Sequence, residues 1–384
     1  MPGSYAYFPL ERVIFGRPAS EAASEEVSRI GARRVFVVAS HSLSTGTGVV
    51  DALADALGAR YAGRFDRCVA HSTWTSVIET AQAVRAANPD LILTVGGGTP
   101  VDTVKIVQLV LAHDVRDEAG LDALHTTVMP DGRRVVPQVK ASPVRQVAVP
   151  TTLSGAEFSN LAGGTEPRSR IKHSFIGPDI GPRSVILDPA LTVHTPEWLW
   201  LSTGIRALDH AVEAILSVES NAYCDGLSLH ALRLFAKWLP RTKADPADLD
   251  ARLASQQATW LAASTINRLA FGASHGIGHA LGAAAEVPHG YTSCVMLPHV
   301  MRFNESATRD KQRLIAEALG GPAADAVASL ISSLGLPTRL RDVRVEKHRL
   351  PAVAEAALKN VWVRMNPRPI RSTDDVMKLL EAAW

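Results

Sequence analysis

The sequence predicts an α/β domain with a mostly parallel sheet, followed by an all-helical domain. In the first half, short apolar runs alternate with segments of helical spacing, which is typical of strand–helix–strand units. From about residue 196 onward only helical spacing continues. The length of 384 residues also fits two domains, at roughly 100–200 residues each. We place the boundary near Asp188-Pro189, which gives domains 1–188 and 189–384.

The strands are predicted from short runs of β-branched residues bounded by turn signals. Fully buried parallel strands have this composition because both faces of their sheet are covered. A proline or glycine punctuates most of these runs. In chain order the expected strands are 34–39, a weaker 60–64, 91–95, 147–149 and 185–187, and the expected helices between them are 49–57, 77–87 and 101–111.

The remaining segments complete the expected organisation. Residues 113–146 are mixed in charge and contain Pro130-Asp-Gly132, so we expect a surface excursion or a hairpin. The later helices are expected within 196–201, 208–240 and 248–270.

The composition excludes several classes of protein. The chain has 40 Lys+Arg and 38 Asp+Glu, and the net charge of +2 is too small to favour nucleic-acid binding. The N-terminus lacks a signal-peptide pattern, and no apolar run reaches about 18 residues. The three cysteines are scattered, which rules out a disulfide framework. We therefore expect a cytoplasmic protein with neither a membrane nor a nucleic acid as its partner.

A glycine-rich motif joins the clearest strand to the next helix. It runs from Gly96 to Lys105 as GGGTPVDTVK. Glycines allow close backbone approach, and the free N–H groups of the following helix favour a phosphate. The spacing is neither that of a P-loop nor a complete GxGxxG. A pyrophosphate site is the favoured interpretation, and a plain structural turn is the alternative.

A hydroxyl-rich loop follows the strand at 147–149. Thr151, Thr152 and Ser154 lie in the run PTTLSGAE. Ligands of open α/β sheets bind at the carboxyl ends of the strands, where this loop is expected. The loop is a candidate ligand contact, although Ser/Thr/Gly loops are often only connections.

Histidines are concentrated in two short apolar segments of the second half. His275 and His279 are spaced i, i+4 on one helix face, His289 follows a proline, and His210 lies upstream. For any single histidine, an ordinary core or surface role is the alternative. The motif HGIGH lacks the glutamate of a zinc protease. Ser274 matches a GxSxG nucleophile elbow, but the preceding segment predicts a helix where that elbow requires a strand.

Together these motifs resemble the group III, or iron-containing, alcohol dehydrogenase family, and in particular its maleylacetate reductase branch. The similarity covers nearly the whole chain and includes the specific run from Pro288 to Asn304 (PHGYTSCVMLPHVMRFN). It implies the dehydroquinate synthase-like architecture of that family, in which a nucleotide-binding α/β domain precedes a helical domain and the active site lies between them. It also implies a homodimer, and hydride transfer between a nicotinamide and a carbonyl or alcohol carbon.

The resemblance assigns cofactor-binding roles by motif. Gly97, Gly98 and Thr99 would hold the pyrophosphate, and Asp102 would support their loop. The ribose and nicotinamide end would be lined by Thr151, Thr152 and Lys172. Ser40 falls where NAD-preferring members often carry an aspartate, and a serine there does not repel a 2′-phosphate. The expected cofactor is therefore NADH or NADPH.

The metal site implied by the resemblance is altered. In iron-dependent members an aspartate and three histidines hold the metal, and the histidines would be His210, His275 and His289. The aspartate position is Arg206, and a guanidinium repels a dication and offers it no lone pair. Asp209 is adjacent to His210 and on a helix points about 100° away from it. Maleylacetate reductases also lack the aspartate, although they usually carry asparagine there.

We therefore expect a metal-independent, NAD(P)H-dependent reductase of a keto acid or another carbonyl compound. Arg206 would polarise the carbonyl or bind a substrate carboxylate. His279 or His275 would donate the proton, with His210 and His289 nearby. Alternatively, Arg206 pairs with Asp209 or Glu213 and leaves the site inert.

Three other functions stay open. The first is an alcohol dehydrogenase with iron or zinc held by the three histidines. The second is a non-catalytic nucleotide-binding relative. The least favoured is a serine hydrolase acting through Ser274.

Overall fold

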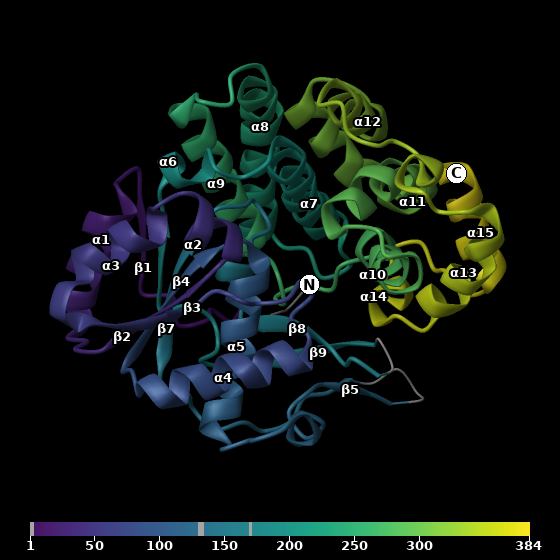
Figure 1. The fold of residues 1–384 in the computed structure, drawn as a ribbon. Coiled ribbons are helices and arrows are strands. Elements are labelled where there is room, and N and C mark those ends of the chain that lie inside the picture. The colour runs from purple at the N-terminus through teal and green to yellow at the C-terminus, as the bar shows by residue number, and fades with distance from the viewer. Residues whose placement is uncertain (1–3, 130–133, 169–170) are drawn as a thin grey trace. The chain divides into compact units, whose positions relative to one another are not determined.

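Six parallel strands form the sheet of the first half of the chain (Figure 1). The computed structural model describes residues 4–129, 134–168 and 171–384. The strand order is β1-β10-β7-β4-β2-β3, and every neighbouring pair is parallel. The bounds are β1 Arg12–Phe15, β2 Val35–Ala39, β3 Tyr61–Phe65, β4 Leu91–Gly96, β7 Arg145–Pro150 and β10 Ser184–Leu187.

Helices cover both faces of this sheet, which explains its continuous apolar strands. In β2, Val35 and Val37 pack into one core cluster, while Phe36 and Val38 pack into the other, as the alternation of a strand requires. The first cluster includes α1 (Ala19–Ile30) and α3 (Val49–Leu57). The second includes α4 (Trp74–Ala87) and α5 (Gly98–Ala112). The predicted mostly parallel α/β fold is confirmed.

Some elements were not predicted from the sequence. These are β1, α1, α2 (His41–Gly46), and the antiparallel hairpin of β8 (Leu161–Thr165) and β9 (Lys172–Ile176). Strand β8 reads LAGGT, and two glycines weaken a strand pattern. Helix α1 is rich in glutamate and serine, so its apolar stripe is narrow.

The excursion predicted for residues 113–146 contains a short antiparallel hairpin. It consists of β5 (Thr127–Val128) and β6 (Arg134–Val135). The predicted turn at Pro130-Asp-Gly132 lies outside the described residues. The described part agrees with the hairpin interpretation.

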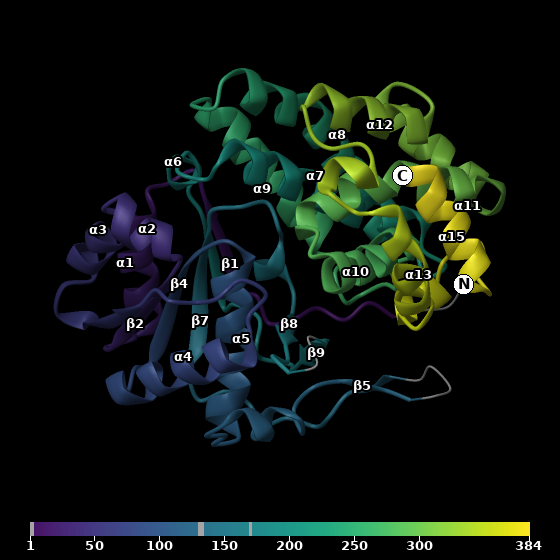
Figure 2. The ribbon, with the colours of Figure 1, turned by 45° about the vertical axis from the view of Figure 1, so that its right-hand side comes forward.

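The second half is helical throughout Pro196–Trp384, all of which is described. Within it, α10, α13 and α15 lie side by side (Figures 1 and 2). The helices are α7 Glu197–Leu216, α8 Ala222–Ala244, α9 Leu249–Ala263, α10 Ala273–Ala285, α11 His289–Leu319, α12 Ala323–Ser333, α13 Leu350–Leu358, α14 Val361–Arg364 and α15 Thr373–Ala383. The predicted all-helical second domain is confirmed as a fold class.

The helix ends differ from the predicted ranges for local reasons. The expected segment 208–240 is broken, because Asn221 caps a new helix by accepting a hydrogen bond from the backbone N–H of Cys224. The expected segment 248–270 ends early at Ala263, and Asn267 takes a positive φ of 60°. By residue contacts the chain divides into Met1–Thr195 and Pro196–Trp384. The boundary near Asp188-Pro189 stays a prediction.

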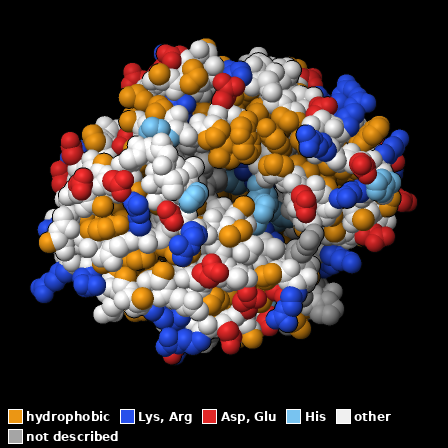
Figure 3. Space-filling view, viewed as in Figure 1, with side chains coloured by type: hydrophobic (Ala, Val, Ile, Leu, Met, Phe, Trp, Pro, Cys, Tyr) orange, Lys and Arg blue, Asp and Glu red, His pale blue; other side chains and the backbone are white. Residues whose placement is uncertain are grey.

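Charged side chains of both signs are interspersed over the face shown in Figure 3. Within the described residues, no single helix has the length and apolarity to cross a membrane. The bent pair α11 and α12 meets that test of length and composition only when its two helices are counted together.

Candidate active site

The glycine-rich motif lies at the switch point of the parallel sheet. Strands β2 and β4 are neighbours, but the chain continues from β2 to β3 on one side and from β4 to β7 on the other. Ligands of open α/β sheets bind outside the carboxyl ends of the strands at such a point. Ser40 directly follows β2, and Gly97 directly follows β4. Two of the predicted cofactor positions therefore meet here.

The glycines are required by their close neighbours. Gly96 has a φ of 141°, and a Cβ there would lie 2.1 Å from Ser40 Oγ. A Cβ on Gly97 would lie 3.0 Å from Thr152 Cγ2, and one on Gly98 would lie 3.0 Å from Ser154 Oγ. The loop is thus closely surrounded by hydroxyl side chains.

Helix α5 begins at this loop with Gly98 and Thr99. Its first N–H groups have no partner within the helix and are suited to a phosphate. Thr151 fixes the loop from the adjacent strand, because its N–H donates to the carbonyl of Gly96 at 2.9 Å. This geometry agrees with the pyrophosphate interpretation of the motif.

Asp102 ties α5 to the β8–β9 hairpin. Its Oδ2 accepts from the N–H of Gly163 at 3.3 Å, and its Oδ1 accepts from Lys105 Nζ at 3.2 Å. Lys105 is fully buried and also donates to the carbonyls of Ala156 and Leu161, at 2.5 and 2.7 Å. Burial lowers the pKa of Lys105, and the charge of Asp102 opposes that shift.

Lys105, the last residue of the GGGTPVDTVK motif, thus connects α5 to the carbonyls of Ala156 and Leu161. The sequence did not predict this structural role. The predicted cofactor residue Lys172 begins β9 and is exposed. A Cβ on Gly163 would lie 2.2 Å from its Cε, so the lysine stem crosses the strand that Asp102 holds.

In the second unit, helix α7 supplies a row of buried polar residues on one face. Asp209 and Glu213 are one turn apart, and Arg206 and His210 are offset from them by three residues each. Their exposed fractions range from 0% for Asp209 to 8% for Arg206. Long polar side chains are rarely buried so completely unless they are paired.

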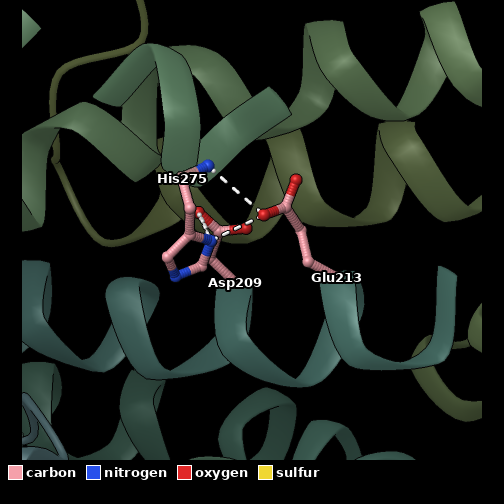
Figure 4. Close-up of side chains that lie close together, drawn as sticks. All are labelled: Asp209, Glu213 and His275. Atoms are coloured by element: carbon pink, nitrogen blue, oxygen red, sulfur yellow. Dashed lines mark hydrogen bonds and ion pairs between the residues drawn. The ribbon is translucent and has the colours of Figure 1, made fainter. Parts of the chain in front are cut away.

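Glu213 holds the first turn of α10 and the ring of His275 (Figure 4). Its carboxyl oxygens accept from the backbone N–H groups of Gly272, Ser274 and His275, at 3.0, 2.8 and 3.2 Å. The Nδ1 of His275 lies 2.7 Å from Glu213 Oε2. Burial and the charge of Asp209 raise the pKa of Glu213 to about 8, while the three backbone bonds act in the opposite direction.

Asp209 is held by two serines. Its Oδ2 accepts from Ser274 Oγ at 2.7 Å and from Ser293 Oγ at 2.6 Å. Its Oδ1 has no hydrogen-bond partner among the described residues. Burial raises the pKa of Asp209 to about 6, against the opposing charge of Arg206. As expected from the helix geometry, its contacts differ from those of His210, whose ring stacks on Phe271.

Arg206 lies beside this carboxylate. Its Nη1 donates to Ser293 Oγ at 3.1 Å and lies 3.8 Å from Asp209 Oδ2. The predicted alternative of an Arg206–Asp209 ion pair is therefore present in the structure. Burial lowers the pKa of Arg206, which remains the most basic group of the cluster. Ser293 occupies one of five N–H groups, so the guanidinium retains donors for a ligand.

The imidazoles of His210 and His275 stack with ring centroids 4.8 Å apart. Burial, followed by the charge of Arg206, holds the pKa of both rings well below the usual range. Both are therefore neutral at neutral pH. Among the described residues, His210 Nδ1 and His275 Nε2 have no hydrogen-bond partner.

His279 and His289 are only partly buried. The ring of His279 packs on the ring of Trp362, with centroids 4.6 Å apart, and its centroid lies 6.0 Å from that of His289. The structure thus places the four predicted histidines in one region of the helical unit. Trp362, Asp209, Glu213 and Ser293 were not among the predicted site residues.

The ligand set that the family resemblance implies for a divalent metal is altered in this chain. Among the described residues, the group whose ligand atoms lie within 4.8 Å of one another is Asp209, Glu213 and His275, not the three histidines. These carboxyl groups already accept hydrogen bonds from serines, backbone and imidazole. Arg206 adds a buried positive charge beside them. A dication here would face that charge and would lack the aspartate that the resemblance implies at position 206.

Ser274 is not placed as a nucleophile. It lies in the first turn of α10, is fully buried, and donates to Asp209. The segment before it is the end of α9 and a turn, not a strand. The geometry of a nucleophile elbow is therefore not present at this serine.

A dinucleotide-type loop at a sheet switch point and a buried histidine cluster on helices agree with a nucleotide-dependent oxidoreductase. Residues 10–189 match iron-containing alcohol dehydrogenase, and residues 200–384 match the C-terminal part of the Fe-containing alcohol dehydrogenase family. The chain belongs to the iron-containing alcohol dehydrogenase family. The predicted family, fold class and enzyme class are confirmed.

Individual relatives align over nearly their whole length. Dehydrogenase ALT3 of Alternaria alternata is 34% identical and covers 92% of this chain and 99% of its own. Lactaldehyde reductase of Escherichia coli K12 is 31% identical, with coverages of 97% and 98%. The solved structure of maleylacetate reductase from Agrobacterium tumefaciens is 27% identical, with a TM-score of 0.85 over 100% of this chain and 98% of that one.

Proposed function

We propose that this enzyme reduces a carbonyl compound to an alcohol with NADH or NADPH and without a bound metal. The observation that carries the proposal is the buried guanidinium of Arg206 among neutral imidazoles. It stands at the position where the resemblance implies the metal-binding aspartate. A fixed positive charge is thus built into the chain where relatives recruit one.

Arg206 would stabilise the oxygen of the substrate. A bound nicotinamide would supply a hydride, and negative charge would develop on the carbonyl oxygen of the substrate. A preorganised donor in a dry site stabilises such charge far more than water does. Ser293 and Asp209 hold the guanidinium in place, at 3.1 and 3.8 Å from Nη1.

His279 would deliver the proton to the alkoxide. His275 is 1% exposed and its Nδ1 is engaged by Glu213, so it is poorly placed to exchange protons with water. His279 lies one turn further along α10 and is partly exposed. It can therefore be reprotonated from solvent after each turnover.

In the first unit, Gly97, Gly98 and Thr99 would bind the pyrophosphate, while Thr151, Thr152 and Lys172 would face the nicotinamide half. Ser40 lies at the end of β2, beside Gly96, where an aspartate would exclude a 2′-phosphate. Its neutral hydroxyl is compatible with both NADH and NADPH.

The substrate class follows from the same arginine. A guanidinium donates to a carbonyl oxygen and, more strongly, to a carboxylate. Relatives named maleylacetate reductase and lactaldehyde reductase act on small carbonyl compounds. We propose a keto acid such as maleylacetate first, and a small ketone or aldehyde second. A homodimer and a cytoplasmic location stay predictions.

The direct test is steady-state oxidation of NADH and NADPH with maleylacetate, lactaldehyde and a panel of ketones and aldehydes. Turnover with at least one of them is expected. Tight cofactor binding with no turnover on the whole panel would overturn the proposal and would favour a non-catalytic relative.

A second candidate is a metal-dependent alcohol dehydrogenase. The observation in its favour is that His210 Nδ1 and His275 Nε2 are buried without a hydrogen-bond partner among the described residues. Orphaned imidazole nitrogens are typical of ligand positions. Metal content, combined with activity after chelation, separates the two candidates.

A further inference from the structure

A hollow lies within the helical unit, lined by residues outside the histidine cluster. Its volume is about 340 Å³, at the lower end of the range for small-ligand sites. It is formed by segments far apart in the sequence: the middle of α11, helix α12, the turn 338–341 and the end of α15. The lining residues are Cys294, Pro298, His299, Arg302, Ala328, Ile331, Thr338, Arg339, Arg341, Ala382 and Trp384.

The charged side chains of this lining all have the same sign. Arg302, Arg339 and Arg341 all border the hollow, and its lining contains no acidic residue. Arg302 is partly compensated by Asp325, with Nη2 2.8 Å from Oδ1. Arg339 and Arg341 form no ion pair with any residue that the structure describes. Two uncompensated guanidinium groups at one concavity attract an anion.

Asp342, which follows Arg341 in the chain, is already engaged by backbone groups. The Oδ2 of Asp342 accepts from the backbone N–H groups of Thr338 and Arg339, at 3.2 and 3.0 Å. That carboxylate therefore holds the turn in shape. The guanidinium of Arg341 lies over the ring of Trp384, 5.6 Å from its centroid.

The floor of the hollow is apolar. Cys294 and Ile331 are almost completely buried, and Pro298, Ala328 and Ala382 add further aliphatic surface. Burial raises the pKa of the Cys294 thiol strongly, so it remains a neutral, apolar group. An occupant with an apolar or aromatic body would therefore be covered on that side.

We propose that this hollow is a binding site for a small organic anion, whose carboxylate or phosphate group is held by Arg339 and Arg341 and whose apolar body packs against Ala328, Ile331 and Trp384. Guanidinium groups pair with either anion through two parallel hydrogen bonds. The site is separate from the residues of hydride transfer, and it does not depend on the proposed function.

The proposal is tested on the full-length protein at low ionic strength by calorimetric titration. The probes are benzoate, phenyl phosphate and inorganic phosphate. Saturable binding of one molecule per chain is expected for benzoate or phenyl phosphate. Their relative affinities identify the anionic group, and inorganic phosphate, which has no apolar body, is expected to bind more weakly than phenyl phosphate.

Three variants separate the site from general charge effects. Arg339→Ala/Arg341→Ala is expected to weaken binding by about tenfold or more, since each hydrogen bond to a charged group is lost. Arg309→Ala/Arg313→Ala removes the same charge from exposed positions of α11 outside the hollow, and binding should stay within about twofold. Ala328→Phe fills the hollow without changing charge and should also abolish binding.

The overturning results are equally specific. They are failure of both organic probes to bind the wild type, equal loss in the two arginine pairs, and binding that persists in Ala328→Phe. Binding of a probe at the glycine loop of the first unit would persist in all three variants and would also overturn the assignment. Thermal melting of each variant checks that it is folded.

Discussion

The two candidate regions of this enzyme are built in opposite ways. The glycine loop after β4 depends on backbone and on the absence of side chains. Gly96, Gly97 and Gly98 leave space that is enclosed by hydroxyl groups from the segments following β2 and β7. The polar cluster of the helical unit relies on long ionisable side chains buried against one another, such as Arg206, Asp209 and Glu213. The first region is characterised by closely enclosed backbone, and the second by buried ionisable groups.

This difference explains how each region tolerates change. In the loop, replacing a glycine by alanine is expected to destabilise the structure through steric clash. In the cluster, the disturbance is the loss of one charge, which leaves its partner buried and uncompensated.

The largest effect is expected for Arg206→Ala. Removing a preorganised donor from the developing oxyanion should lower kcat/KM by about 10²- to 10³-fold. Arg206→Lys keeps the charge but not the planar donors, and should be intermediate. Steady-state NAD(P)H oxidation measures both, and the double variant Arg206→Ala/Asp209→Asn controls for the unpaired carboxylate. Activity of Arg206→Ala within twofold of wild type would remove the arginine from the mechanism.

His279→Gln is expected to lower kcat by about 10²-fold, at the lower end for a general acid, because water can partly replace a half-exposed histidine. The same assay measures it. His230→Gln, at an exposed position of α8, serves as the control and should be unchanged. If His275→Gln reduced kcat while His279→Gln did not, the proton donor would be the other histidine.

Gly96→Ala tests the steric character of the loop. Alanine at this position would have a φ of 141° and a Cβ in contact with Ser40 Oγ. The change should lower the free energy of unfolding by about 1–3 kcal/mol and weaken cofactor binding. Denaturant melts and cofactor titration measure these effects. Gly226→Ala in helix α8 is the matched control, since no atom lies within 4 Å of a Cβ added there. Its effect on the free energy of unfolding should be neutral or stabilising. A Gly96→Ala protein as stable as wild type would contradict the steric account.

Ser40→Asp is expected to weaken the binding of NADPH by about tenfold relative to that of NADH, because a carboxylate at the end of β2 repels the 2′-phosphate. Cofactor Kd values measured by fluorescence titration test this. Ser40→Ala should leave the ratio of the two Kd values unchanged. An unaltered ratio in Ser40→Asp would place the ribose elsewhere.

For Glu213→Gln the expected effect is on the pH dependence of stability. The folded-state pKa of Glu213 is raised from 4.5 to about 8, so the folded protein binds this proton more tightly than the unfolded chain. Its contribution is therefore present below pH 4.5 and is lost as pH rises toward 8. The wild-type free energy of unfolding should fall relative to that of Glu213→Gln over this range. Parallel curves for the two proteins would show that the carboxyl is ionised throughout.

The sequence predicted the loop better than the cluster for a physical reason. The loop is contiguous, so GGGTPVDTVK between a strand and a helix already predicts a turn suited to a pyrophosphate. The parallel sheet was equally accessible, because buried strands such as Val35–Ala39 are continuous apolar runs.

The cluster is assembled from three helices, and no local pattern shows that Ser293 and Ser274 both donate to Asp209. The motif histidines were found, but their protonation depends on burial and on Arg206. The spacing of Asp209 and Glu213 from Arg206 did predict these acids as alternative partners of the arginine, and the ion pair with Asp209 is present.

The most direct test of the central claim is the metal content of protein purified without chelator, measured together with NADH and NADPH oxidation before and after chelation. The claim is that Arg206 replaces a metal ion. It predicts a protein that contains no stoichiometric metal and turns over a carbonyl substrate equally well after chelation. Stoichiometric iron or zinc, with activity lost on chelation and restored by the metal, would contradict it.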